Sequence, residues 1–379
     1  MNYITNIPDQ VLYLKDKSFS ASDIKDSFAS YVQEHYGTES FEYSLAMFLK
    51  EWFNDSPLIQ VKTSGSTGKP KVMMVEKTKM INSACMTLSF LGLKHPDSAL
   101  LCMPLEYIAG KMLVVRALVG SLKLILVPPC SNPIAAISDS EVLNFAAMIP
   151  MQVSSALKDS SHEQRLKAIE HLIIGGGAVD DALASKLKSF PHNVYSTYGM
   201  TETLSHIALR RLSGPQASSF YSVFTGVKVY PSAEQTLTIE APLVNNETLI
   251  TNDIVEFNDQ GQFRVLGRKD NVINSGGVKL QIEELEQWLK DRQSDLDDSY
   301  SRLKNCSLLI SSRPDPKFGS IVVMLYATLD NQELSPNELE VLFDKMPKYW
   351  HPKAIVKVEA IPLTGTNKPD RAQAKILAQ

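Results

Sequence analysis

Residues 58–71 read LIQVKTSGSTGKPK, an apolar run followed by hydroxyls, glycines and lysines. The apolar run predicts a strand, and the glycines after it let successive backbone N–H groups turn toward one anion. The hydroxyls add donors and the lysines add positive charge, which suits a polyphosphate. The spacing is not that of Walker A, GxxxxGK[ST]. A solvated Ser/Gly turn would explain the composition alone, but the full string from Thr63 to Lys71 is more specific and predicts a phosphate-binding loop.

The segments around this loop indicate a sheet covered by helices. From residue 58 to about 180, short apolar runs such as SALLCMP, LKLILVPP and HLIIGGG alternate with helical patterns such as KTKMINSACMTLSFLG and VDDALASKLKSF. Such alternation favours helices on the faces of a sheet. Residues 1 to about 60 have apolar positions at helical spacing behind Ser and Asp caps, so we expect this segment to be helical.

The second half of the chain is organised differently. Between about 220 and 266, VKVYPS, QTLTIEA, ETLITNDIVEF and GQFRVLG are β-rich pieces between turns, which predicts a small antiparallel or barrel-like subdomain. After GRKD the pattern is helix, strand, strand, helix, strand and a C-terminal loop. We therefore expect an α/β fold with a large N-terminal domain (1–268) and a small α+β C-terminal domain (270–379).

Charge and composition limit the kinds of molecule that we expect this protein to bind. A formal charge of −4 over 379 residues provides no broad attraction for nucleic acid. The start, MNYITNIPDQ, lacks the features of a signal peptide, and no run approaches the roughly 18 apolar residues of a membrane span, so we expect a cytoplasmic protein without membrane insertion. The cysteines lack CxxC spacing, and we expect free buried thiols and no transition metal at Cys85, Cys102, Cys130 and Cys306. The oligomeric state stays open, a homo-oligomer included.

Five further motifs follow the phosphate loop in a fixed order. They are GGGA at 175–178, YGMTET at 198–203, the aspartate of LITNDIVEF at 249–257, GRKDNVINSGGVKL at 267–280 and PLTGTNKPDR at 362–371. Together with TSGSTGKPK, this series resembles the adenylate-forming family of acyl-CoA synthetases, peptide-synthetase adenylation domains and luciferases. The resemblance covers about residues 58–371. It implies the adenylate-forming enzyme fold, with a mobile C-terminal domain.

The resemblance also implies a site for ATP and Mg²⁺. The phosphate loop would contribute Thr63, Ser64, Gly65, Ser66, Thr67, Gly68 and Lys71. The adenine pocket would be lined by Gly175, Gly176, Gly177 and Ala178, with Tyr198 stacking on the base beside Gly199. Asp253 and Arg268 would hold the ribose, although Asn252 stands where the family usually has Gly. Thr201 would contact the α-phosphate and Glu202 would bind Mg²⁺, a hard cation that prefers oxygen ligands.

The implied reaction joins a carboxylic acid to coenzyme A through an acyl-adenylate. Lys368 matches the family's catalytic lysine, which bridges the carboxylate and the α-phosphate, although Asn367 replaces the usual Gly. The C-terminal domain would then rotate about Asp270, so that Gly276 and Gly277 border the channel for coenzyme A. The chain is thus expected to be an ATP-dependent acid–thiol ligase.

The acid is less narrowly determined. Tyr107 and Gln152 fall at pocket-lining positions of the family. In YGMTETLSHIALRR, the polar and basic residues Ser205, His206, Arg210 and Arg211 could lie near a second carboxylate or on a solvated helix face. The whole pattern is most similar to the bacterial ligases for o-succinylbenzoate, an aromatic dicarboxylic acid of menaquinone biosynthesis. Another aromatic or medium-chain acid is the alternative. A non-catalytic nucleotide-binding homologue is disfavoured because Glu202 and Lys368 are both present.

Overall fold

A nine-stranded sheet, in the order β11-β10-β9-β8-β7-β5-β6-β1-β2, forms the centre of the molecule. The computed structural model describes residues 3–62, 72–138, 140–364 and 368–379. Six strands, from β9 across to β1, run parallel. The strands are β1 Leu12–Leu14, β2 Lys17–Phe19, β5 Ser98–Leu101, β6 Lys123–Leu126, β7 Phe145–Met148, β8 His171–Ile174, β9 Asn193–Gly199, β10 His206–Arg211 and β11 Ser222–Val223.

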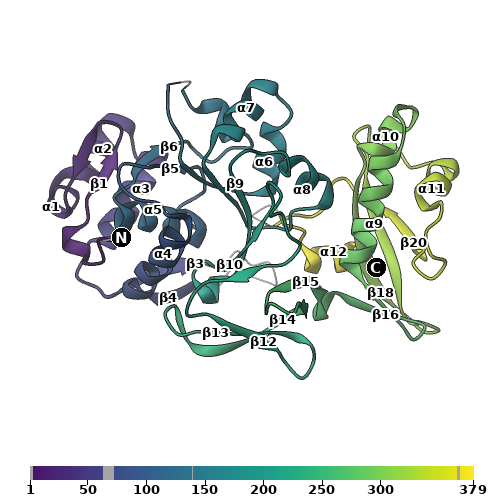
Figure 1. Ribbon diagram of the computed structural model, residues 1–379. Helices are drawn as coiled ribbons and strands as arrows, with labels where there is room; N and C mark the ends of the chain where they lie inside the picture. The colour runs from purple at the N-terminus through teal and green to yellow at the C-terminus, as the bar shows by residue number, and fades with distance from the viewer. Residues whose placement is uncertain (1–2, 63–71, 139, 365–367) are drawn as a thin grey trace.

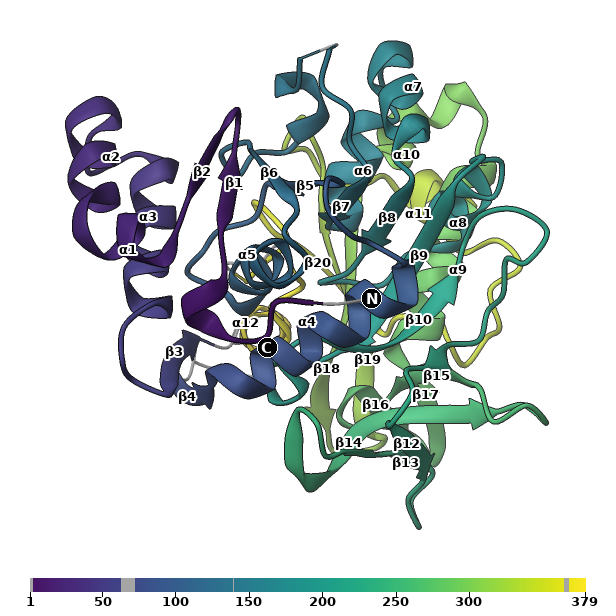
Figure 2. The same cartoon turned by 60° about the vertical axis from the view of Figure 1, so that its left-hand side comes forward.

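Helices cover both faces of this sheet (Figures 1 and 2). Successive side chains of a strand point to opposite faces. Accordingly, Ala147 and Ile173 pack into one core with α3, α4 and α5, while Ala146 and Leu172 pack into a second core with α6, α7 and α8. The helices are α3 Phe41–Trp52, α4 Lys77–Leu91, α5 Ile108–Gly120, α6 Pro150–Ala156, α7 Ser160–Ala168 and α8 Asp181–Leu187. None of the helices that the structure describes is both long and apolar enough to cross a membrane.

Two smaller antiparallel sheets border the large one. The first is a hairpin of β3 (Leu58–Lys62) and β4 (Val72–Glu76), and the phosphate loop predicted between them lies outside the described residues. The second confirms the expected antiparallel subdomain as an open four-stranded sheet. Its strands are β12 Lys228–Pro231, β13 Thr236–Ala241, β14 Asn245–Phe257 and β15 Phe263–Arg268.

The residues after β15 form an α+β unit that lies to the right in Figure 1. It has its own five-stranded sheet and its own two clusters of buried residues. The strands are β16 Val272–Ser275, β17 Val278–Gln281, β18 Ser307–Asp315, β19 Gly319–Ala327 and β20 Ala354–Lys357. The helices are α9 Ile282–Asp295, α10 Ser301–Lys304, α11 Pro336–Phe343 and α12 Arg371–Leu377. The molecule thus has the mixed α/β architecture expected from the sequence.

Two expectations near the chain ends were wrong. The N-terminal segment contains the expected helices, α1 (Ala21–Asp23) and α2 (Ala29–Tyr36) joined by a π-helical stretch, but the β1–β2 hairpin precedes them. Its strands are three residues each, too short to show an alternating pattern, and β1 is held by parallel pairing with the distant β6. At the other end, the expected loop contains α12, whose first N–H groups are capped by Asp370.

Candidate active site

A pocket of about 460 Å³ lies at the carboxyl ends of the parallel strands. Its lining includes Met103, Ile149, Gly176 and Gly199, which stand at or just after the ends of β5, β7, β8 and β9. The strands β6 and β7 lie on opposite sides of β5, so the loops that leave β5 and β7 diverge. Such a reversal of strand order opens a crevice at the carboxyl edge of a parallel sheet, where ligands bind.

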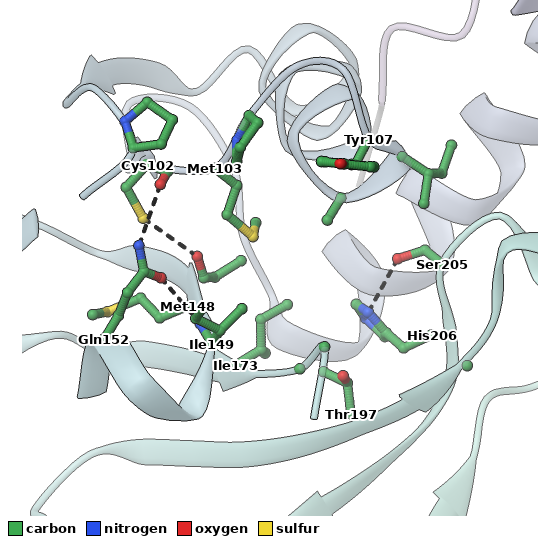
Figure 3. Close-up of a pocket in the computed structure, with 18 of the residues that line it drawn as sticks. Cys102, Met103, Tyr107, Met148, Ile149, Gln152, Ile173, Thr197, Ser205 and His206 are labelled. Atoms are coloured by element: carbon green, nitrogen blue, oxygen red, sulfur yellow. Dashed lines mark hydrogen bonds between the residues drawn. The ribbon is translucent and has the colours of Figure 1, made fainter. Parts of the chain in front are cut away.

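The wall of the pocket is mostly apolar, with a few polar groups (Figure 3). Met103, Met148 and Ile173 supply apolar surface. Glycine is required at 175, where a Cβ atom would lie 2.4 Å from Thr197 Oγ1, and at 176, where φ is +79°. Gly175 thus lets the chain after β8 lie close to Thr197 of β9, and Gly176 supplies the left-handed backbone conformation that follows.

All four expected acid-binding residues line this pocket: Tyr107, Gln152, Ser205 and His206. The amide of Gln152 is occupied within the protein (Figure 3), because it donates to the carbonyl oxygens of Cys102 and Cys130 and accepts from the Ile149 N–H. Gln152 therefore connects three loops of the wall.

The thiols Cys102 and Cys130 also line the pocket. Cys130 is exposed and Cys85 is half-buried, so the expectation that all four thiols are buried was wrong.

A charged residue that the sequence interpretation missed, Arg116, also lines the pocket. It lies in the middle of α5 and is 2% exposed. Its Nη2 donates to Ser205 Oγ at 2.5 Å, but Nε is buried without a partner, and no described carboxylate forms an ion pair with the guanidinium. Burial lowers the pKa of Arg116 to about 9, so it remains a cation at neutral pH. A lone arginine inside the apolar run MLVVRALVG was the available sequence signal.

Ser205 connects Arg116 to two further buried polar residues. Ser205 Oγ lies 3.2 Å from His206 Nδ1 (Figure 3), and His206 Nε2 lies 3.0 Å from Thr87 Oγ1 on α4. Burial, with a smaller contribution from the Arg116 charge, lowers the pKa of His206 well below its usual value. His206 is therefore neutral, and Arg116 is the cation of this group.

The C-terminal unit contributes Lys368 to the same pocket. Burial, together with the nearby Arg268 charge, lowers the pKa of the Lys368 amine. Its ammonium group has no hydrogen-bond partner among the residues that the structure describes. Thr201 also lines the pocket, and the neighbouring Glu202 is exposed, with its carboxylate unpaired within the described part of the chain. An open carboxylate of this kind fits a hard divalent cation that keeps several waters.

The residues expected at adenine and ribose form a connected cluster beside the pocket. The Tyr198 hydroxyl donates to Asp253 Oδ2 at 2.5 Å, and Arg268 Nη1 donates to Asp253 Oδ1 at 3.1 Å. Arg268 also forms two hydrogen bonds of 2.9 Å with Asp270. Burial and the Asp253 carboxylate raise the pKa of Tyr198 well above its usual value. Residues from β9, β14 and β15 thus meet at one point.

Other expected site residues lie apart from the pocket. Gly177 and Ala178 are exposed, and so are Gly276 and Gly277 in the turn between β16 and β17. Arg210 and Arg211 belong to a strand, not to a helix, and contact Tyr221 and Tyr195. Within the described residues, no cluster of three or more potential metal ligands occurs.

Comparison with known proteins identifies relatives across most of the chain. A family model described as AMP-binding enzyme matches residues 20–262. The chain is 24% identical to the 2-succinylbenzoate–CoA ligase of Lactococcus lactis subsp. lactis, covering 83% of this chain and 70% of that one. It is 23% identical to the enzyme of the same name from Bacillus cereus strain ZK, covering 97% and 79%.

Solved structures are also similar to this chain. An acyl-CoA synthetase (AMP-forming)/AMP-acid ligase II-like protein from Dyadobacter fermentans is 31% identical, with a TM-score of 0.58, over 88% of this chain and 93% of that one. The o-succinylbenzoate coenzyme A synthetase of Bacillus subtilis, in complex with ATP and magnesium, is 15% identical, with a TM-score of 0.72, over 97% of both chains.

Proposed function

The chain belongs to the AMP-binding enzyme family and is an ATP-dependent, AMP-forming acid–CoA ligase, and from this premise we propose that its acid is 2-succinylbenzoate. The ligases of Lactococcus lactis and Bacillus cereus carry that substrate in their names, at 24% and 23% identity. The proposal for this chain therefore depends on its own pocket.

Arg116 carries the proposal. A buried cation without a counterion costs several kcal/mol, unless a ligand brings the missing negative charge. A monocarboxylic acid has its one carboxylate directed at ATP, so it leaves Arg116 unpaired. A dicarboxylic acid can direct one carboxylate at ATP and pair the other with Arg116. The apolar wall of Met103, Met148 and Ile173 suits the aromatic ring between its two carboxylates.

The two carboxylates of 2-succinylbenzoate differ in accessibility. The one on the succinyl chain is flexible and unhindered, whereas the one on the ring is flanked by the ortho acyl group. We assign the succinyl-chain carboxylate to ATP, near Lys368 and Thr201, and the ring carboxylate to Arg116. Bidentate pairing of a guanidinium with a carboxylate also fixes the orientation of the ring.

In the first half-reaction, an oxygen of the chain carboxylate attacks the α-phosphorus of ATP. The bond from that phosphorus to the leaving pyrophosphate breaks, and the acyl-adenylate forms. The Lys368 ammonium would stabilise the negative charge that develops on the attacking and phosphoryl oxygens. The apolar wall would protect the mixed anhydride from water.

Nucleotide and metal binding are assigned to residues near this point. Asp253 and Arg268 would hold the ribose, Tyr198 the adenine and Thr201 the α-phosphate, while residues 63–71 would hold the other phosphates. Glu202 would bind Mg²⁺, which supplies positive charge at the phosphates when bound.

In the second half-reaction, the thiol of coenzyme A attacks the acyl carbon and the bond to AMP breaks. Lys368 occupies the pocket in this structure, so the C-terminal unit must move to admit the thiol. We propose the boundary between units near Asp270, with the exposed Gly276–Gly277 turn moving toward the pocket.

The experiment is pyrophosphate release with ATP and Mg²⁺ over a panel of acids, with acyl-CoA formation measured after coenzyme A is added. The panel compares 2-succinylbenzoate with 4-oxo-4-phenylbutanoate, which lacks only the ring carboxylate. We expect kcat/KM to be at least about 100-fold higher for the dicarboxylate, since a charged hydrogen bond contributes about 1.5–3 kcal/mol and the pair forms more than one. Equal turnover of both acids, or preference for the monocarboxylate, would exclude 2-succinylbenzoate and leave the ligase assignment intact.

A further inference from the structure

A series of hydrogen bonds connects the pocket to Thr87 in the interior-facing side of α4. It starts at Arg116 Nη2, passes through Ser205 Oγ and both ring nitrogens of His206, and ends at Thr87. Thr87 is 0% exposed and does not line the pocket. Its Oγ1 also lies 3.3 Å from the Ser83 carbonyl oxygen, one turn earlier in the helix.

The groups at the two ends of this series determine which atom donates and which accepts in each hydrogen bond. At the inner end the Thr87 hydroxyl donates to the Ser83 carbonyl, which leaves its oxygen free to accept the N–H on Nε2 of His206. A neutral His206 with its proton on Nε2 has a lone pair on Nδ1, and this lone pair accepts the Ser205 hydroxyl. The Ser205 oxygen is then free to accept from Arg116, which can only donate.

We propose that Thr87 is a specificity-determining positioning residue, which acts through His206 and Ser205 to hold Arg116 in place for the second carboxylate of the acid. The inference rests on the proposed function and deepens it. Thr87 and His206 make no contact with the reacting carboxylate in this assignment. They hold the Ser205 hydrogen on His206, so that a lone pair of the serine oxygen faces the guanidinium.

Loss of the Thr87 acceptor would exchange the donor and acceptor roles of Ser205 and His206. The His206 proton could then move to Nδ1, where it would face Ser205 and make the serine oxygen an acceptor from the histidine. The serine oxygen would then accept from His206 as well as from Arg116, and the serine hydrogen would lose its acceptor and turn, which reorients the lone pair that faces Arg116. The one hydrogen bond that Arg116 donates to a described residue would be weakened, and the guanidinium would be held less firmly in the pocket. Binding of a dicarboxylate would therefore weaken, whereas a monocarboxylate, which does not pair with Arg116, would bind as before.

The test compares Thr87→Val, which keeps the side-chain shape without the hydroxyl, with Thr87→Ser, which keeps the hydroxyl. Pyrophosphate release is measured for 2-succinylbenzoate and for 4-oxo-4-phenylbutanoate. For Thr87→Val we expect KM for the dicarboxylate to rise about tenfold or more, with kcat/KM for the monocarboxylate changed by less than about twofold. Thr87→Ser should restore the wild-type preference for the dicarboxylate.

Thr238→Val, at another buried threonine on β13, controls for the general effect of this substitution. It should leave the ratio of the two kcat/KM values unchanged. If Thr87→Val lowers activity with both acids equally, or with neither, the positioning role is overturned while the proposed function stands. If the wild-type protein does not discriminate between the two acids, both proposals are overturned.

Discussion

Burial of the Arg116 charge disfavours folding, whereas the proposed binding of a dicarboxylic acid needs that charge. Ten of its neighbours in α5, from Gly110 to Gly120, are buried, and the charge sits among them without a described counterion. Removing such a charge in favour of a well-packed apolar side chain is often neutral or stabilising. The cost of burying Arg116 therefore indicates that its use lies in binding.

We predict that Arg116→Met raises the free energy of unfolding, or leaves it unchanged, while abolishing the preference for the dicarboxylate. Methionine fills a similar volume without charge, and a gain of about 1–2 kcal/mol is within the range for removal of buried ionic groups. The kcat/KM for 2-succinylbenzoate should fall by about 100-fold. Thermal unfolding and pyrophosphate release measure the two effects separately.

Arg264→Met is a suitable control, because Arg264 is a partly exposed arginine of β15 that pairs with Glu256. It should change neither substrate preference nor stability by much. A strong loss of stability in Arg116→Met would instead assign a structural role to Arg116.

The residues that sequence patterns could locate are those that lie in contiguous motifs. Tyr198, Asp253 and Arg268 were expected at one nucleotide, and their hydrogen bonds to one another place them together. The role of each remains a prediction. Arg116 could not be found in this way, because its partner Ser205 lies 89 positions away, and only packing of α5 against the sheet joins them.

At the scale of elements, Lys368 depends on a cross-link between α9, β18 and α12. Arg371, the first residue of α12, forms two hydrogen bonds of 2.7 Å with Glu286 of α9. Arg371 also donates to the Ile310 carbonyl of β18, and Glu286 accepts from the Ile310 N–H. Lys368 lies three positions before Arg371, so this cross-link sets where the lysine enters the pocket.

We predict that Arg371→Met slows adenylation by about tenfold or more, because a displacement of about 1 Å at a reacting group has effects of this size. The partly buried pair should also contribute to stability, and a double-mutant cycle with Glu286→Gln should give a coupling energy of about 1–3 kcal/mol. Adenylation is measured by pyrophosphate release, and stability by urea unfolding.

The control is Arg302→Met, which breaks the Arg302–Glu338 pair elsewhere in the same unit. It should lower stability without a specific effect on adenylation. If the effects of Arg371→Met and Glu286→Gln on stability simply add, or if Arg302→Met slows adenylation equally, the positioning role of the cross-link is wrong.

Elements were predictable where a periodic pattern was long enough. The 15-residue helix α4 and the strands β13 to β15 appear where the sequence indicates them. The hairpin β1–β2 could not be predicted, since its stability comes from pairing with β6, more than a hundred positions away. The helix α12 was missed although Asp370, a good N-cap, precedes an alanine-containing stretch.

At the scale of the whole molecule, two units that fold around separate cores share one pocket. Most of its lining comes from the large unit, but Lys368 comes from the small one. Among the described residues, the polar contacts between the two units include Gln281 Nε2 to the Arg268 carbonyl at 3.0 Å and an exposed pair of Lys290 with Asp180 at 4.0 Å. Polar contacts of this kind are compatible with the movement that we propose for the small unit between half-reactions.

In the proposed cycle this arrangement corresponds to the first half-reaction, because Lys368 lines the pocket and the Gly276–Gly277 turn is exposed and away from it. We predict that Lys368→Ala slows adenylation by about 1,000-fold, yet slows thioester formation from preformed acyl-adenylate by less than about tenfold. Gly277→Val should do the reverse, because φ at 277 is +84° and a β-branched residue strains the turn. Each half-reaction is measured in single-turnover experiments, with pyrophosphate release for the first and acyl-CoA formation for the second. If both variants impair both half-reactions equally, a single orientation serves the whole cycle, and rotation of the small unit is not required.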